Sequence, residues 1–126
     1  MEYTVTLSEV LESEIRMGYK NVSQFCRKKN IPYMTVQGVI KRGVENTTVS
    51  TLQKICDALD ITITQLFRMR SMITIQEKLD NDPNYSNEDL LDDLIEEKVI
   101  DPKNYNHEQL LTIAQNYRYF NSDEWL

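Results

Sequence analysis

The chain has 126 residues, of which 40% are hydrophobic and 27% charged, as is usual for a soluble protein of one domain or a small domain with an appendage. Three glycines, one histidine and two cysteines are too few for a glycine-rich phosphate loop, a dinucleotide-binding turn or a multi-ligand zinc site. No apolar run reaches the roughly 20 residues that span a bilayer, and the first residues do not resemble a signal peptide. We therefore expect a cytoplasmic protein with reduced cysteines, no metal and no cofactor.

Charge is distributed unevenly along the chain, whose net charge is −6. Residues 1–70 carry ten basic and seven acidic side chains, whereas residues 71–126 carry four basic and thirteen acidic ones. Eight of the basic residues lie from Arg16 to Lys54, where Glu45 is the only acid. Because clustered charge of one sign sets the local potential, an anionic partner should be attracted to this stretch and repelled by the second half.

Apolar residues recur at helical spacing through residues 1–70, which predicts five short helices packed as a compact bundle. The first helix is expected over 8–17, with Gly18 in the left-handed conformation that ends many helices. Asn21 and Gln24 lie three residues apart at the start of the second helix. This spacing predicts a reciprocal cap in which each side chain accepts from the other residue's backbone N–H.

Turn and capping residues separate the remaining helices. The stretch Asn30-Ile31-Pro32 should end the second helix, and the third is expected over 33–42, with Gly43 terminating it. Thr48 should cap the fourth helix, and a Thr62–Gln65 capping box should begin the fifth. The side chains expected to face the core are Leu7, Val10, Leu11, Ile15, Phe25, Cys26, Val36, Val39, Ile40, Val49, Leu52, Ile55, Cys56, Leu59, Leu66 and Phe67.

The second half is expected to be a separate acidic helical domain. It contains a sequence pattern that is echoed twenty residues later. The pattern that begins Asp82-Pro83-Asn84-Tyr85 recurs as Pro102-Lys103-Asn104-Tyr105, each time followed by a capping residue and a Leu-Leu pair. A true internal repeat and convergence on a favourable helix start explain this echo equally well. Two amphipathic helices are predicted over 87–99 and 107–120, and apolar residues over 73–79 favour a short helix before them. The apolar faces of the two longer helices are Leu90, Leu91, Leu94, Ile95 and Val99, then Leu110, Ile113, Ala114, Tyr117 and Phe120.

The order of helix, Asn-Ile-Pro turn and helix within residues 23–42 is typical of a helix-turn-helix motif. Two stretches extend this pattern, Asn21-Val22-Ser23-Gln24-Phe25-Cys26-Arg27-Lys28-Lys29-Asn30-Ile31-Pro32-Tyr33-Met34-Thr35-Val36 and Thr48-Val49-Ser50-Thr51-Leu52-Gln53-Lys54-Ile55-Cys56-Asp57-Ala58-Leu59-Asp60-Ile61. With them, residues 6–68 resemble the Cro/repressor-type (XRE-like) family of DNA-binding domains, as seen in phage repressors. The resemblance implies an all-α, five-helix fold for residues 1–70 and double-stranded DNA as the partner.

The helix expected over 33–42, which is the second helix of the motif, should read DNA, because a major groove about 12 Å wide admits one α-helix. Gln37 has the amide needed for a bidentate pair with adenine, and Tyr33 and Met34 are suited to a thymine methyl group or the sugar-phosphate wall. The family resemblance also assigns base reading to these three positions. The residues expected to contact bases are Tyr33, Met34, Gln37 and Lys41, and those expected to contact phosphates are Ser23, Arg27, Lys28, Arg42, Asn46 and Thr47.

Two functions are consistent with this sequence. The first is a sequence-specific transcriptional regulator, a homodimeric repressor from a phage or mobile element, with residues 71–126 as the dimerisation domain. The second is an antitoxin or anti-CRISPR-like inhibitor whose acidic domain binds a partner protein while the helix-turn-helix autoregulates its operon. No carboxylate pair or nucleophile–base set stands out, so an enzyme is not expected. In either case the expected dimer or partner interface consists of Leu90, Leu94, Leu110, Tyr117 and Phe120.

Overall fold

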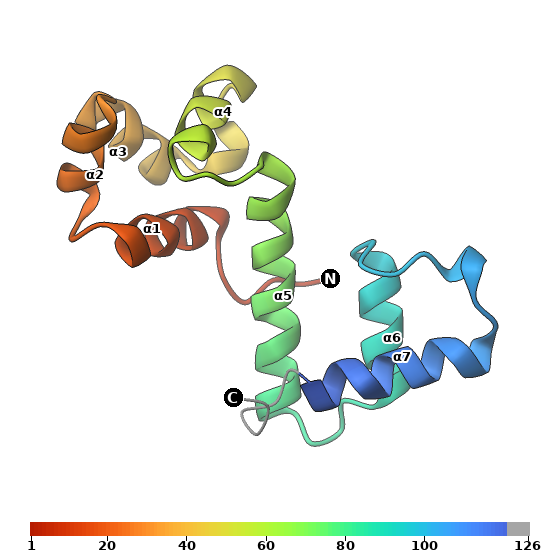
Figure 1. Ribbon diagram of the computed structural model, residues 1–126. Coiled ribbons are helices and arrows are strands. Elements are labelled where there is room, and N and C mark those ends of the chain that lie inside the picture. Colours follow the sequence, from red (N-terminus) through yellow and green to blue (C-terminus); the bar gives the residue numbers. More distant parts are fainter. Residues whose placement is uncertain (121–126) are drawn as a thin grey trace. The chain divides into compact units, whose positions relative to one another are not determined.

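The computed structural model describes residues 1–120, and within this range every regular element is a helix, as the sequence predicts (Figure 1). These residues form two compact units. The N-terminal unit is Val5–Arg70, and the C-terminal unit combines Met1–Thr4 with residues 71–120. In chain order the elements are α1 (Leu7–Gly18), α2 (Val22–Lys29), α3 (Tyr33–Arg42), the 3-10 helix η1 (Val44–Asn46), α4 (Val49–Ala58), α5 (Ile63–Asn81), α6 (Asn87–Glu96), the 3-10 helix η2 (Pro102–Asn104) and α7 (His107–Phe120).

The N-terminal unit is built around one apolar core. The helices α1, α2 and α3 each pack against the other two, and η1 packs against α1 and α3. The first helix contributes one face at helical spacing, and α3 contributes two valines that are fully buried. The buried core residues are Leu7, Val10, Leu11, Ile15, Val22, Phe25, Cys26, Ile31, Val36, Val39, Val44, Leu52, Ile55, Cys56 and Leu66.

Side-chain caps begin most of these helices where the sequence places them. Thr62 Oγ1 accepts from the N–H of Gln65 at 2.9 Å, and Gln65 Oε1 accepts from the N–H of Thr62 at 2.8 Å, so the predicted box is present. Asn21 Oδ1 likewise accepts from the N–H of Gln24 at 2.8 Å. The reciprocal half differs from the prediction, because Gln24 Oε1 accepts from the N–H of Lys20 rather than from that of Asn21. The Gln24 side chain thus still satisfies a backbone donor that precedes α2, the N–H of Lys20.

Three further expectations for the N-terminal unit are corrected by the structure. Gly18 lies inside the last turn of α1 and does not have a positive φ, because the chain leaves the helix through an extended Tyr19 whose ring packs edge-on against Phe25. Val49 is 73% exposed, since as the first residue of α4 it lies beyond the stretch that faces the core. Phe67 is 37% exposed, and its ring lies 5.7 Å from the guanidinium carbon of Arg70.

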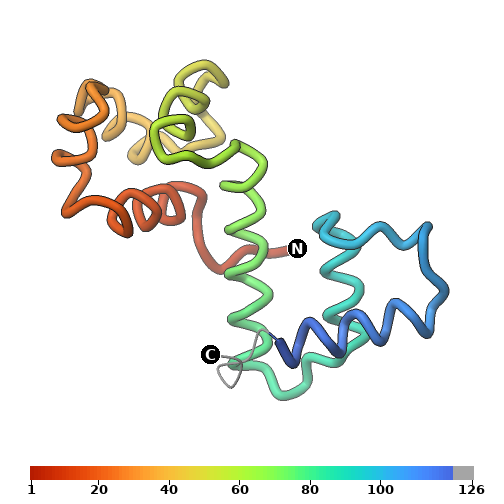
Figure 2. Tube along the Cα trace, in the orientation of Figure 1, coloured from red at the N-terminus to blue at the C-terminus, as the bar shows by residue number. Residues whose placement is uncertain are grey.

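The predicted fifth helix and the short helix over 73–79 are a single helix, α5 (Figure 2). The residues between them, 68–72, contain neither glycine nor proline, so nothing in the backbone breaks the helical hydrogen bonds. Residues of α5 up to Arg70 belong to the N-terminal unit, and those from Ser71 belong to the C-terminal unit.

In the C-terminal unit, α6 and α7 pack against each other over a second apolar core. The sixth helix ends at Glu96 rather than at the predicted residue 99, because Lys98 takes a left-handed φ of 59° and the N–H of Val99 returns to the carbonyl of Leu94. The core consists of Ile75, Tyr85, Leu90, Leu91, Leu94, Leu110 and Ala114.

The chain uses three residues of the expected dimer or partner interface for this core. Leu90 and Leu94 are 0% exposed and Leu110 is 7% exposed within the single chain, so these side chains are not accessible to a second molecule. Tyr117 is half-buried and Phe120 is exposed. Helix α6 alone shows one apolar face, but only tertiary packing decides whether that face meets the same chain or another one.

The two copies of the echoed pattern begin α6 and α7 in the same way but differ in burial. Ser86 and Asp89 form a reciprocal cap, as do Asn106 and Gln109. Tyr85 is buried and its hydroxyl donates to Asp93 Oδ2 at 2.6 Å, whereas its counterpart Tyr105 is 45% exposed. The shared helix start is therefore a local property of the sequence, whereas the burial of each tyrosine depends on the residues packed around it.

Candidate nucleic-acid interface

The turn between α2 and α3 positions the candidate recognition helix. Asn30 has φ 56° and ψ 46°, the left-handed conformation that its side chain tolerates, and this ends α2 as predicted. Ile31 is buried, and its N–H donates to the carbonyl of Cys26 at 3.0 Å, which anchors the turn to α2. Pro32 then precedes α3 without forming a side-chain cap. These contacts hold α3 at a defined position against α2.

Helix α3 has one face in the core and the other in solvent. Val36 and Val39 are 0% exposed, whereas Met34 is 77% and Tyr33 46% exposed. Lys41 is also exposed, and Gln37 is half-buried. Residues four apart are neighbours on a helix, so Tyr33, Gln37 and Lys41 form one row along the outer side. The structure thus brings all four predicted base-contacting residues onto one surface.

A hydrogen bond that was not predicted from the sequence joins two of these residues. Gln37 Nε2 donates to the Tyr33 hydroxyl at 2.8 Å. The spacing of four residues is the signal that predicts such a contact, because side chains at positions i and i+4 face each other on a helix.

The end of α3 is closed by residues that the sequence assigns to phosphate contacts. Asn46 Nδ2 donates to the carbonyl of Arg42 at 2.8 Å, and Thr47 Oγ1 donates to the carbonyl of Gly43 at 3.3 Å. Arg42 is exposed, and its guanidinium lies so close to Gly38 that a Cβ there would be 2.8 Å from Nη1. The glycine leaves room for the arginine side chain to lie along the helix.

The other predicted phosphate contacts lie on α2. Ser23, Arg27 and Lys28 are all exposed, and the helix has no acidic residue in its first turn. Backbone N–H groups at the start of a helix attract anions, and the same applies to α4, which Thr48 caps through the N–H of Thr51. Val49 at that start is a surface residue, although its spacing predicts a core position.

The comparison with protein families agrees with this geometry. Residues 15–70 match the family model described as the Cro/C1-type HTH DNA-binding domain. This part of the chain is a Cro/C1-type helix-turn-helix domain. The match runs from the last part of α1 through α2, α3 and α4 into α5, so it includes the turn and the exposed face of α3. No curated protein and no solved structure matches the chain.

The cysteines of the Cro/C1-type domain are part of its packing. Cys26 and Cys56 are buried free thiols, and burial raises the pKa of both. A thiol that stays protonated is a poor nucleophile and a poor metal ligand. Over residues 1–120 the structure holds no cluster of three or more His, Cys, Asp or Glu side chains arranged for a metal ion, and no helix long and apolar enough to cross a membrane.

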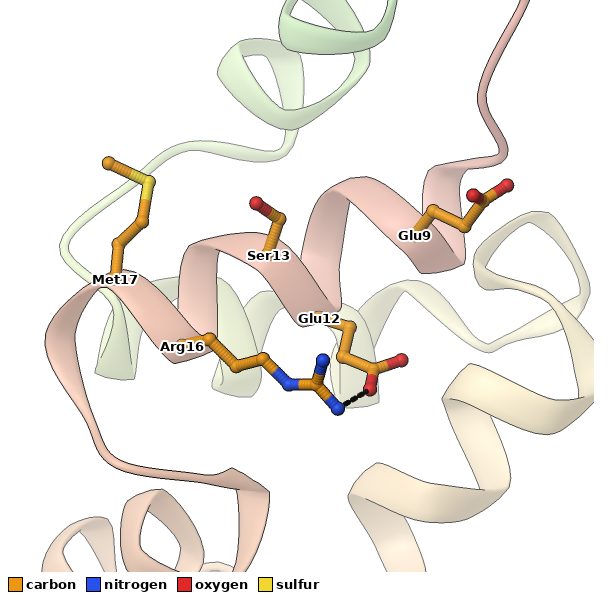
Figure 3. A pocket seen from close by; sticks show the side chains of 5 residues that line it. All are labelled: Glu9, Glu12, Ser13, Arg16 and Met17. Carbon is orange, nitrogen blue, oxygen red and sulfur yellow. Dashed lines mark hydrogen bonds and ion pairs between the residues drawn. The ribbon is translucent and has the colours of Figure 1, made fainter.

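A hollow of about 460 Å³ lies on the surface of α1 (Figure 3), and none of its lining residues belongs to α3. Its lining residues Glu9, Glu12, Ser13, Arg16 and Met17 all come from one helix. Arg16 forms an ion pair with Glu12, which neutralises the only base in the hollow. Two glutamates beside it make the site unsuitable for a phosphate group.

Proposed function

We propose that the protein is a sequence-specific DNA-binding transcriptional regulator that acts in the cytoplasm as a homodimeric repressor, and that it comes from a phage or another mobile element. The outer face of α3 is the observation that supports this proposal. Val36 and Val39 anchor the helix in the core, and the polar and apolar side chains opposite them remain accessible. A helix held in this way can enter the major groove with its first residues against the base edges.

Each exposed residue has a distinct role in the proposal. Gln37 pairs with adenine, a contact that discriminates against other bases by about 1–3 kcal/mol. Met34 packs on a thymine methyl group, and Lys41 reaches a base edge one turn farther along α3. Arg27 and Lys28 contact phosphates, which positions the domain without reading sequence.

Dimerisation follows from the small size of the domain. A single helix-turn-helix makes few phosphate contacts, so one copy binds weakly, whereas a two-fold dimer binds half-sites about 34 Å apart or a multiple of that distance. The dimer of this proposal uses a surface other than Leu90, Leu94 and Leu110, because those residues form the core of the C-terminal unit.

Selection of bound sequences from random duplex DNA, with the full-length protein, tests the proposal. The expected result is a palindromic site whose half-sites each contain an adenine that depends on Gln37. Binding with no sequence preference over a range of salt concentrations would contradict the proposed function.

Two substitutions separate base reading from phosphate contact. Gln37→Ala should lower the preference for one base pair per half-site by about 1–3 kcal/mol. Lys28→Ala should weaken binding to all sequences alike and reduce the slope of log K against log salt by about 1 for each copy bound. Fluorescence anisotropy with the selected site, with single-base variants and with a scrambled duplex measures both effects. Equal losses for the two variants on every duplex would contradict the assigned roles.

A second candidate function rests on the acidic surface of α6. Glu88 and Asp92 are exposed, and Asp89, Asp92 and Asp93 line a hollow of about 340 Å³ with Lys78 and Tyr85. Such a surface suits a basic partner protein, as in the inhibitor hypothesis. In that case Glu88→Lys with Asp92→Lys should release a partner that copurifies from the native host, whereas Asp57→Lys on α4 should retain it. A protein that copurifies equally with both variants would count against this surface.

A further inference from the structure

We propose that Tyr33 is a positioning residue that orients the Gln37 amide, so that the pair, rather than Gln37 alone, selects adenine. This inference rests on the proposed function, because it concerns how the same face of α3 reads a base. It goes further by giving the Tyr33 hydroxyl a role separate from any contact with DNA.

The geometry is a direct contact between two side chains on one helix. Gln37 Nε2 lies 2.8 Å from the Tyr33 hydroxyl oxygen and donates to it. The backbone of α3 is held in place near the pair, because Val36, which lies between them in the sequence, and Val39, which follows Gln37, are fully buried. Tyr33 is 46% exposed, so its ring lies at the surface where a duplex would approach, while Gln37 is half-buried beside it.

The hydrogen bond determines which atoms of the amide face outward. An amide has two N–H donors and one carbonyl acceptor, and the bond to Tyr33 uses one donor. Gln37 therefore presents Oε1 as an acceptor and its second N–H as a donor, in a fixed order. Adenine offers the complementary pair in the major groove, since N6 donates and N7 accepts. Rotation of the amide by half a turn reverses that order and misaligns both contacts.

Orientation before binding also lowers the entropic cost of recognition. A free glutamine side chain samples several rotamers and both orientations of its amide, and all but one are lost when it pairs with a base. The tyrosine hydroxyl restricts these states in the unbound protein. The discrimination for adenine should consequently depend on a group that is not itself required to touch the base.

Tyr33→Phe is the matched variant, because it removes only the hydroxyl and keeps the ring. We would measure binding of the full-length protein and of Tyr33→Phe, Gln37→Ala and the double variant. The duplexes are the selected site, the same site with each base pair replaced in turn, and a scrambled duplex. Tyr33→Phe should reduce discrimination about threefold to tenfold at the adenine that depends on Gln37 and at no other position. The double variant should behave like Gln37→Ala, because without the amide the hydroxyl has nothing to orient.

A measurement without DNA tests the contact itself. In ¹⁵N–¹H spectra of the free protein, the side-chain amide signals of Gln37 should shift in Tyr33→Phe, where the ring remains and only the hydrogen bond is lost. Unchanged Gln37 signals would overturn the inference. Unchanged circular dichroism and thermal unfolding are expected, since Tyr33 lies outside the core.

The outcomes distinguish this inference from the proposed function. If Gln37→Ala changes base preference and Tyr33→Phe does not, the positioning role is wrong and the proposed function stands. If Tyr33→Phe weakens binding to every duplex equally, the hydroxyl contacts a phosphate and the inference is again wrong. If the unmodified protein shows no sequence preference, the proposed function fails first.

Discussion

Two glycines in the N-terminal unit show how one residue's conformation decides its tolerance to substitution. Gly43 has φ 99° and ψ 136° at the end of α3, a region that other residues rarely adopt. Gly18, at the end of α1, has helical conformation, and an added Cβ would meet nothing within 4 Å. Both glycines follow a predicted helix, so their different roles became visible only in the folded chain.

Gly43→Ala should lower the free energy of unfolding by about 1–3 kcal/mol, the usual cost of strained backbone in a residue with a Cβ. A Cβ there would also lie 2.6 Å from Glu45 Oε1, which a flexible side chain can relieve. Gly18→Ala is the control and should be neutral or stabilising by up to about 1 kcal/mol. Urea unfolding of the two variants measures the difference, and equal stabilities would contradict the assigned conformations.

Tyr85 stabilises the C-terminal unit through a hydrogen bond that depends on pH. Its buried hydroxyl donates to Asp93, which also accepts from Lys78 Nζ at 3.0 Å. Tyr85→Phe should therefore destabilise the C-terminal unit by about 1.5–3 kcal/mol at pH 7. Tyr105→Phe, at the matching position of the echo, should have little effect, because Tyr105 is exposed.

Burial, followed by the hydrogen bond to Asp93, raises the pKa of Tyr85 above its usual value. A raised pKa in the folded state means that the unfolded chain loses this proton first as the pH rises. The contribution of Tyr85 is thus complete below about pH 10 and decreases above it. The stability difference between the unmodified protein and Tyr85→Phe should shrink from pH 9 to pH 11 in urea unfolding, and a constant difference would contradict this assignment.

Helix starts are the elements that the sequence predicts best. A capping box needs only two residues three positions apart, so the boxes at Thr62 and Ser86 are local and can be read directly. Helix ends and lengths were predicted less well. Helix α6 ends before residue 99 because Lys98 has a left-handed φ and the N–H of Val99 donates to the carbonyl of Leu94. Helix α5 continues because residues 68–72 contain neither glycine nor proline.

Loss of the cap on α5 should therefore have a measurable cost. Thr62→Ala removes the hydroxyl that accepts from the N–H of Gln65 and should destabilise the N-terminal unit by about 1 kcal/mol. Thr64→Ala, at an exposed position two residues later, is the matched control and should be neutral within about 0.5 kcal/mol. Urea unfolding measures both, and equal losses would show that the box does not stabilise α5.

An apolar helix face can pack within its own chain or against a partner molecule. Leu94→Ala should lower the free energy of unfolding by about 2–5 kcal/mol, because Leu94 is fully buried in the C-terminal core. Phe120→Ala should cost less, since Phe120 is 45% exposed. Unfolding followed at several protein concentrations distinguishes the two cases. If the loss at Leu94 appears only as a weaker dimer with unchanged monomer stability, the residue belongs to an interface.

Sequence alone determined the properties that depend on spacing and residue type. The all-α fold, the caps, the apolar face of each helix and the motif around Asn30 follow from positions three or four residues apart, which a helix always brings together. The contact between Tyr33 and Gln37 has the same spacing, but only the structure showed that the hydroxyl and the amide lie within hydrogen-bond distance.

Only the tertiary structure decided which of these faces met each other. It placed Val49 outside the core, joined two predicted helices into α5 and enclosed Leu90, Leu94 and Leu110 within one chain. The physical reason is that apolar burial has no direction of its own. A sequence pattern identifies an apolar helix face that becomes buried, and the packing of the rest of the chain determines what buries it.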